Sequence, residues 1–145
     1  MGFGFPAALG AKVARPDVPV VDIAGDGSFR MTEQELATSV TEKIPVIVVI
    51  LNNSMLGMVA QWQRLFYNRR YAGTELKTSP DFVKLTEAYG AQGIRATSTD
   101  EFSRAIKKAL NSDVTTVIDI PISPEENVFP MVPAGKALKD IILEG

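Results

Sequence analysis

The chain has 145 residues, 46% of them hydrophobic, with a formal charge of -2 and neither cysteine nor histidine. This length and apolar content are enough for one globular domain, which we assign to residues 1–145. The missing residue types exclude disulfides, thiolate metal sites and histidine-based acid–base catalysis, and the weak negative charge argues against a nucleic-acid partner.

The longest apolar run, residues 46–51, is far shorter than the roughly 20 residues that cross a bilayer. No signal-peptide pattern opens the chain. We therefore predict no membrane contact and a cytoplasmic location.

Short β-branched apolar runs alternate with segments of helical periodicity. Residues 18–24, 46–51 and 114–120 are predicted strands, and residues 91–96 are a weaker fourth candidate. This alternation is typical of an α/β domain that is doubly wound, with a mostly parallel sheet and helices on both faces. The predicted helices cover residues 6–14, 32–43, 58–66, 80–89 and 99–110.

Three of these helices begin with capping signals. Capping boxes are predicted for Thr32 with Glu35 and for Ser98 with Glu101. Ser79 is a candidate N-cap, because proline follows it at the first helical position.

The two ends of the chain have unusual compositions. Residues 123–135 hold three prolines and are predicted to be extended over the surface, followed by a short helix near residues 136–143, so that residues 123–145 form a tail. The glycine-rich opening enters a helix with no preceding strand. We interpret Met1 as an internal methionine of a longer polypeptide.

Polar residues follow the first two predicted strands. Asp26 comes after the first strand and Asn53 after the second, and the carboxyl ends of parallel strands converge at one edge of a sheet. Gly25 and Gly27 flank Asp26, which leaves room for a ligand, and the amides of Gly27 and Ser28 could face an anion. Carboxylate and amide oxygens suit Mg²⁺, which usually also binds phosphate oxygens. A diphosphate held through a metal is the predicted ligand.

Competing interpretations of these residues are structural or invoke other phosphate motifs. Taken singly, a Gly-Asp-Gly turn and a pair of asparagines are more often loop residues than ligands. No P-loop pattern is present, and the glycine-rich opening does not follow a strand as a dinucleotide-binding motif requires.

The motifs together resemble those of a known enzyme family. One pattern resembles the diphosphate-binding signature of thiamine diphosphate enzymes: GDG, followed by 24 residues (28–51), followed by NN. Two longer stretches resemble the catalytic subunit of acetolactate synthase, also called acetohydroxyacid synthase. They are LGMVAQWQRLFYNRRYAGT (56–74) and PEENVFPMVPAGKALKDII (124–142). The resemblance covers essentially the whole chain and implies the C-terminal, diphosphate-binding domain of a longer subunit.

The resemblance also implies roles for individual residues. Asp26, the Asn53 side chain and the Met55 carbonyl would bind Mg²⁺, while Met31 and Trp62 would line the substrate approach. No catalytic residue can be assigned, since the family's activating glutamate belongs to another domain. Residues implied to bind thiamine diphosphate are Met1, Gly25, Gly27, Ser28, Asn53, Gly57 and Met58.

Simpler interpretations exist for two groups of side chains in the same segment. Met58, Trp62 and Phe66 have the spacing of one helix face and could form a core stripe. The arginines at 64, 69 and 70 suggest a solvated face or an interface rather than a nucleic-acid site.

The implied activity is thiamine diphosphate- and Mg²⁺-dependent carboligation of two 2-keto acids. Pyruvate would be decarboxylated and condensed to 2-acetolactate or 2-aceto-2-hydroxybutyrate, in branched-chain amino acid biosynthesis. We expect no turnover by this chain alone. The FAD of the full-length enzyme is bound mostly outside it.

The implied partners are the N-terminal and middle domains of the same subunit, a second or further copies in a homodimer or homotetramer, a small regulatory subunit, and 2-keto acid substrates. An exposed apolar surface is expected where a partner domain docks. Two alternatives stay open. One is another thiamine diphosphate-dependent 2-keto acid decarboxylase, which could be a two-chain enzyme. The other is a non-catalytic α/β module that binds diphosphate or a partner.

Overall fold

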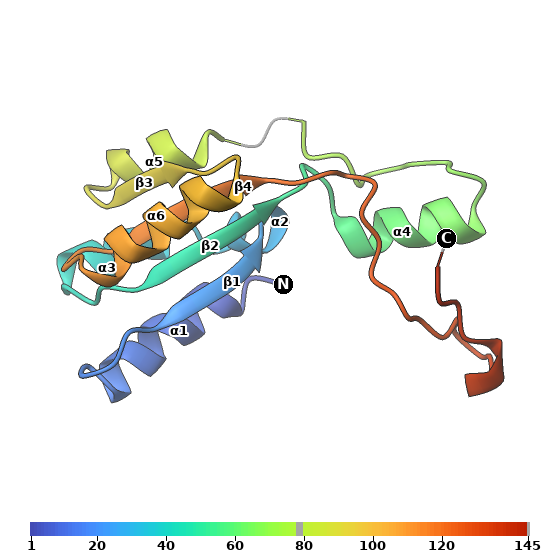
Figure 1. The fold of residues 1–145 in the computed structure, drawn as a ribbon, viewed down its shortest axis with the longest axis horizontal. Helices are drawn as coiled ribbons and strands as arrows, with labels where there is room; N and C mark the ends of the chain where they lie inside the picture. Colours follow the sequence, from blue (N-terminus) through green and yellow to red (C-terminus); the bar gives the residue numbers. More distant parts are fainter. Residues whose placement is uncertain (78–79, 145) are drawn as a thin grey trace.

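A parallel four-stranded sheet forms the centre of the protein in the computed structural model, which describes residues 1–77 and 80–144 (Figure 1). Its strand order is β1-β2-β4-β3, and all three neighbouring pairs are parallel. The predicted α/β fold with a parallel sheet is thereby confirmed, and each strand begins one to three residues later than predicted. The strands are β1 (Val21–Gly25), β2 (Ile47–Asn52), β3 (Gln92–Arg95) and β4 (Thr116–Pro121).

Helices cover both faces of the sheet. On one face, Phe5, Phe29 and Phe82 are almost fully buried against strand residues such as Val48 and Ile50. Their rings follow one another, with centroid separations of 5.2 and 5.8 Å. The helices of this face are α1 (Gly4–Ala14), α2 (Asp26–Phe29), α3 (Glu35–Thr41) and α5 (Phe82–Ala88).

The opposite face is covered by one helix, α6 (Thr99–Leu110). Its small residues Ala105 and Ala109 pack against β2 and β4, and no residue of β1 belongs to this cluster. Consequently Ile23 on β1 is 71% exposed, although it lies in a strand of the central sheet. The expected exposed apolar surface therefore includes the outer face of β1.

α4 (Gly57–Phe66) and the C-terminal tail lie beyond the carboxyl ends of the strands (Figure 1). Residues 123–144 of the tail contain no strand or α-helix, and one 3-10 turn, η1 (Leu138–Asp140), stands in place of the predicted helix at 136–143. An isolated antiparallel bridge between Met131 and Ile142 takes up backbone groups that a longer helix would need. No helix within the described residues is long and apolar enough to span a bilayer.

The capping predictions have mixed outcomes. Ser98 caps α6 by accepting a hydrogen bond from the backbone N–H of Glu101, as predicted. The box at Thr32 is wrong, because α3 begins only at Glu35 and the N–H of Glu35 donates to the backbone carbonyl of Thr32. Ser79 lies outside the described residues, and Asp81 caps α5 instead by accepting from the N–H groups of its first turn.

Candidate functional site

The first loop of the site begins where β1 ends. β1 stops at Gly25, and Asp26 is the first residue of the short helix α2. The Asp26 side chain is only 1% exposed. Gly27 follows in a tight environment, since a Cβ at that position would lie 2.8 Å from a methyl carbon of Leu56. The chain therefore presents a buried carboxylate at a strand end, where neighbouring backbone is close.

The Asp26 carboxyl group is electrostatically unusual. Burial raises its pKa above the ordinary value, and the backbone N–H groups of Gly27, Asn53 and Ser54 partly oppose that rise. Its Oδ2 atom is buried without a hydrogen-bond partner among the described residues. A buried carboxylate oxygen without a partner is unfavourable, and a bound cation would remove this cost.

The second loop follows β2 and carries Asn53. The Asn53 Oδ1 atom accepts a hydrogen bond from the N–H of Met55 at 3.0 Å. An amide oxygen has two lone pairs, so this contact leaves one available for a metal ion. The first residue of α4, Gly57, lies so close that a Cβ there would be 2.9 Å from Asn53 Nδ2. The glycine thus makes room for the Asn53 amide.

The two loops open into one cavity of about 500 Å³. Every residue predicted to bind the metal or the cofactor lines it, although those residues come from three separate segments of the chain. These residues are Met1, Gly25, Asp26, Gly27, Ser28, Asn53, Met55, Gly57 and Met58. The N-terminal segment is held there by a hydrogen bond from the N–H of Gly2 to Ser28 Oγ at 3.0 Å.

The cavity also has walls that the sequence analysis did not assign. Gln61 and the tail residues Glu126, Asn127 and Val128 line it. Gln61 and Val128 exchange two hydrogen bonds, of 3.0 and 2.8 Å, which fasten the tail to α4. The sequence carries no local signal for this contact, because the burial of Gln61 is seen only in the structure.

Arg64 fastens the same tail from the next turn of α4. Its side chain is 6% exposed and donates to the backbone carbonyls of Pro124 and Glu125. The interpretation of Arg64 as part of a solvated basic face is therefore wrong. Charged side chains that are buried need partners, and here the tail carbonyls supply them.

Met31 and Trp62 lie outside the cavity. Met31 is 54% exposed, and its Cβ lies beside Gly2. Trp62 is 44% exposed and lines a separate groove on α4, which shares only Val59 with the cavity. Their role in substrate approach stays a prediction. Because Met58, Trp62 and Phe66 are each at least 44% exposed, the interpretation of this stripe as core is wrong.

The donor atoms at the cavity suit a hard cation. Among the described residues, no group of three or more histidine, cysteine, aspartate or glutamate side chains could hold a metal ion. A metal here would therefore need mixed oxygen donors, as predicted for the Asp26 carboxylate, the Asn53 amide and the Met55 carbonyl. Mg²⁺ is commonly bound by few carboxylates together with phosphate and water, so these residues fit it.

Comparison with known proteins gives a consistent result. The family model described as the C-terminal TPP-binding domain of thiamine pyrophosphate enzymes matches residues 1–120. The chain is 50% identical over 142 residues to the probable acetolactate synthase large subunit of Methanocaldococcus jannaschii, covering 98% of this chain and 24% of that protein. It is 46% identical over 142 residues to the acetolactate synthase isozyme 2 large subunit of Escherichia coli, with 98% and 26% covered.

A solved structure shares the fold as well. The thiamine diphosphate-dependent 4-hydroxybenzoylformate decarboxylase of Rhodococcus jostii superposes with a TM-score of 0.79 at 35% identity, over 85% of this chain and 23% of that one. The chain spans about a quarter of the length of the relatives it matches.

Proposed function

Because this chain belongs to the family of C-terminal thiamine diphosphate-binding domains of thiamine pyrophosphate enzymes, we propose that it is the diphosphate-binding part of an acetolactate synthase. The whole enzyme would join two 2-keto acids with loss of CO₂, forming 2-acetolactate or 2-aceto-2-hydroxybutyrate. The observation that carries the proposal is the cavity in which the Asn53 loop meets Asp26, whose buried Oδ2 has no hydrogen-bond partner among the described residues.

The residues of the cavity would divide the work of binding. When bound, thiamine diphosphate would supply a carbon nucleophile for the 2-keto acid and an electron sink for the loss of CO₂. Asp26, the Asn53 amide and the Met55 carbonyl would hold Mg²⁺. The Gly27 and Ser28 backbone, with Gly57 and Met58, would lie against the diphosphate, since glycine allows close approach of the backbone. Met1 would pack against the thiamine.

Other parts of the enzyme would complete the reaction. We assign no residue of this chain to activation of the cofactor, and propose that the activating glutamate and most of the FAD site lie in N-terminal and middle domains. This is supported by relatives that are about four times as long and by the exposed apolar face of β1 around Ile23. A homodimer or homotetramer, a regulatory subunit and a cytoplasmic location remain predictions.

Calorimetry tests the proposal on the full chain. Titration with thiamine diphosphate in the presence of Mg²⁺ is expected to release heat, and omission of Mg²⁺ should remove it. Asp26→Ala should lose this heat, because it removes the only carboxylate among the proposed ligands. The matched control is Asp17→Ala, an exposed acid that pairs with Arg15 outside the cavity.

Equal heats for the native chain and Asp26→Ala would remove Asp26 from the site and contradict the proposal. The chain alone should show no acetolactate formation, because the activating group lies elsewhere. A measured rate for the purified chain would contradict that part.

A second candidate is a decarboxylase that does not join two substrates. It is supported by the likeness to the Rhodococcus jostii decarboxylase. The products from pyruvate distinguish the two, once the missing domains are added: acetolactate indicates the synthase, and acetaldehyde with CO₂ indicates the decarboxylase. Cofactor binding without either product would indicate a non-catalytic module.

A further inference from the structure

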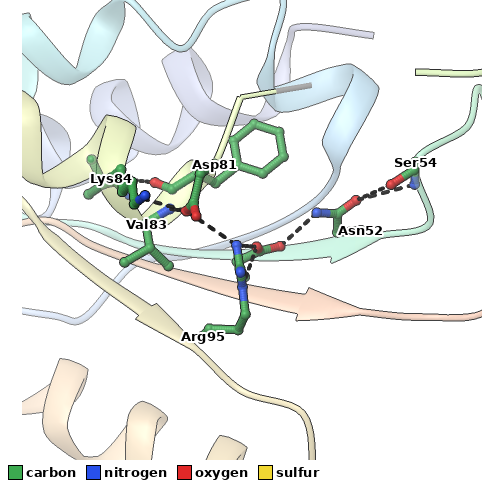
Figure 2. A network of polar contacts seen from close by, with 9 residues as sticks. Asn52, Ser54, Asp81, Val83, Lys84 and Arg95 are labelled. Carbon is green, nitrogen blue, oxygen red and sulfur yellow. Dashed lines mark hydrogen bonds and ion pairs between the residues drawn. The ribbon is translucent and has the colours of Figure 1, made fainter. Parts of the chain in front are cut away.

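A network of polar side chains connects the loop after β2 with Arg95 on β3 and Asp81 at the start of α5 (Figure 2). Asn52, the last residue of β2, donates from Nδ2 to Asp119 Oδ1 at 2.9 Å. Its own Oδ1 accepts from the N–H and the hydroxyl of Ser54, at 3.2 and 3.3 Å. Asn52 therefore links the loop to the neighbouring strand β4.

Asp119 is itself held from the other side. The side chain is 1% exposed, and its Oδ2 accepts from Arg95 Nε and Nη2 at 3.2 and 3.0 Å. Arg95 also donates to Asp81, which caps α5 (Figure 2). Both Asp119 oxygens are thus engaged, which satisfies the buried charge and determines the direction of the oxygen that faces Asn52.

The loop that Asn52 holds has a demanding backbone conformation. Ser54 has φ of 56°, in the left-handed region that non-glycine residues adopt at a cost. The side chain of Asn52 accepts from Ser54, and the Ser54 carbonyl accepts from the N–H of Leu76 at 2.8 Å. Asn53 and Met55 flank Ser54 in the chain. The directions of the Asn53 side chain and the Met55 carbonyl therefore depend on this turn.

We propose that Asp119, acting through Asn52, is a positioning residue for the metal ligands Asn53 and Met55. The proposal rests on the proposed function, because it presumes that these two residues bind Mg²⁺. Neither Asn52 nor Asp119 lines the cavity, so their effect on binding must pass through the loop. Residues behind metal ligands commonly change metal affinity 10- to 100-fold by orienting the ligands.

Metal affinity of the full chain, measured beside its thermal stability, tests the proposal. Mg²⁺ is titrated calorimetrically in the presence of thiamine diphosphate. Asn52→Ala is expected to weaken Mg²⁺ binding about tenfold or more. The control is Asp81→Asn, which keeps a side chain able to cap α5 but weakens the outer ion pair with Arg95. It should leave Mg²⁺ affinity unchanged even where it lowers the melting temperature.

A second variant and a double variant test whether the two residues act as one unit. Asp119→Asn keeps the size of the side chain but removes the charge that Arg95 and Asn52 share. If Asp119 acts through Asn52, the double variant Asn52→Ala/Asp119→Asn should have the same Mg²⁺ affinity as the single variant that binds Mg²⁺ more weakly. The fold-losses of the two single variants should not multiply. Additive losses would overturn the proposed coupling.

The outcomes separate this inference from the proposed function. If Asp26→Ala loses binding while Asn52→Ala and Asp119→Asn bind Mg²⁺ as the native chain does, the positioning role is overturned and the metal site stands. If Asp26→Ala binds as the native chain does, the proposed function itself is wrong. A change in affinity that only follows melting temperature across all variants, Asp81→Asn included, would also overturn the positioning role.

Discussion

The two loops that form the cavity are held in place by different means. The loop after β1, which carries Asp26, is short and buried, and Gly27 packs directly against Leu56 and Leu76. The loop after β2, which carries Asn53, is more exposed and is held by hydrogen bonds. Asn52 donates to Asp119, Leu56 N–H donates to the Thr74 carbonyl, and the Ser54 carbonyl accepts from Leu76 N–H. Steric contact restrains the first loop and polar contact the second.

This difference determines which changes should disturb each loop. Added volume should strain the first loop and the packing around it, so its cost should appear in stability. Displacement of the Asn53 amide in the second loop should move a proposed Mg²⁺ ligand while the core stays intact. Its effect should therefore appear as weaker Mg²⁺ affinity. The predictions below are ordered by expected effect.

Among the variants that test this comparison of the two loops, Gly57→Ala should have the largest effect on binding. The new Cβ would lie 2.9 Å from Asn53 Nδ2, and the amide, as the end of a side chain, can move away. We expect about tenfold weaker Mg²⁺-dependent cofactor binding with little change in melting temperature, since alanine is a better helix former than glycine. Calorimetry and thermal unfolding measure the two effects. The control is Gly10→Ala in α1, where a Cβ meets nothing within 4 Å; unchanged affinity in both variants would contradict the prediction.

Gly27→Ala should reduce stability. Its Cβ would lie 2.8 Å from Leu56 Cδ2 and 3.2 Å from Leu76 Cδ1, so both leucines must shift. We expect a loss of about 1 kcal/mol in the free energy of unfolding, at the low end of overpacking costs because leucine tips can move. Urea denaturation measures it. A variant as stable as the parent would show that the first loop is not restrained by packing.

Asp22→Asn should have a smaller, pH-dependent effect. Asp22 lies on β1, the strand that leads into the Asp26 loop. Burial raises the pKa of Asp22, and its Oδ2 has no hydrogen-bond partner among the described residues. The folded state therefore binds a proton on the Asp22 carboxyl group more tightly than the unfolded state does. Stability should fall as pH rises from the unfolded value of about 4 through the raised pKa.

The stability of Asp22→Asn is compared with that of the parent protein. At pH 7, Asp22→Asn should be more stable than the parent, because it removes a desolvated charge. Below about pH 4 the difference should disappear, since Asp22 is then neutral in both states. Melting temperatures measured across this range check the prediction, and a difference independent of pH would contradict it.

Gly25→Ala should have the smallest effect on stability. A Cβ there meets nothing within 4 Å, and the backbone angles of φ -80° and ψ 155° suit any residue. We expect the free energy of unfolding to rise by about 0.5 kcal/mol, because alanine restricts the unfolded chain more than glycine does. Cofactor affinity should nevertheless fall if the diphosphate lies against Gly25. Unchanged affinity would remove this glycine from the set of cofactor-binding residues.

Local patterns predicted most of the element types. β-branched apolar runs identified three strands and the weaker candidate at 91–96 became the fourth, while α2 was not predicted and the helix expected at 136–143 is only a 3-10 turn. α6 matches its predicted range, 99–110, because its periodicity and its Ser98 cap are both local. The start of α5 was predicted two residues early, because Ser79 and Asp81 are both possible local caps and Asp81 is the one that caps the helix. Asp81 also accepts a hydrogen bond from Arg95 on β3. A tertiary ion pair is not visible in the neighbouring residues.

By itself, the sequence determined that Asp26 and Asn53 each follow a predicted strand, since strand composition and loop residues are local properties. The pairing of β1 with β2, which brings the two loops to one edge of the sheet, was decided by the tertiary structure. Only the tertiary structure decided that β4 lies beside β2, which brings Asp119 to Asn52 across 67 positions of the chain. It alone also brought the tail to the cavity wall and left Ile23 exposed. These features depend on the order in which distant segments pack, and no short stretch of residues specifies that order.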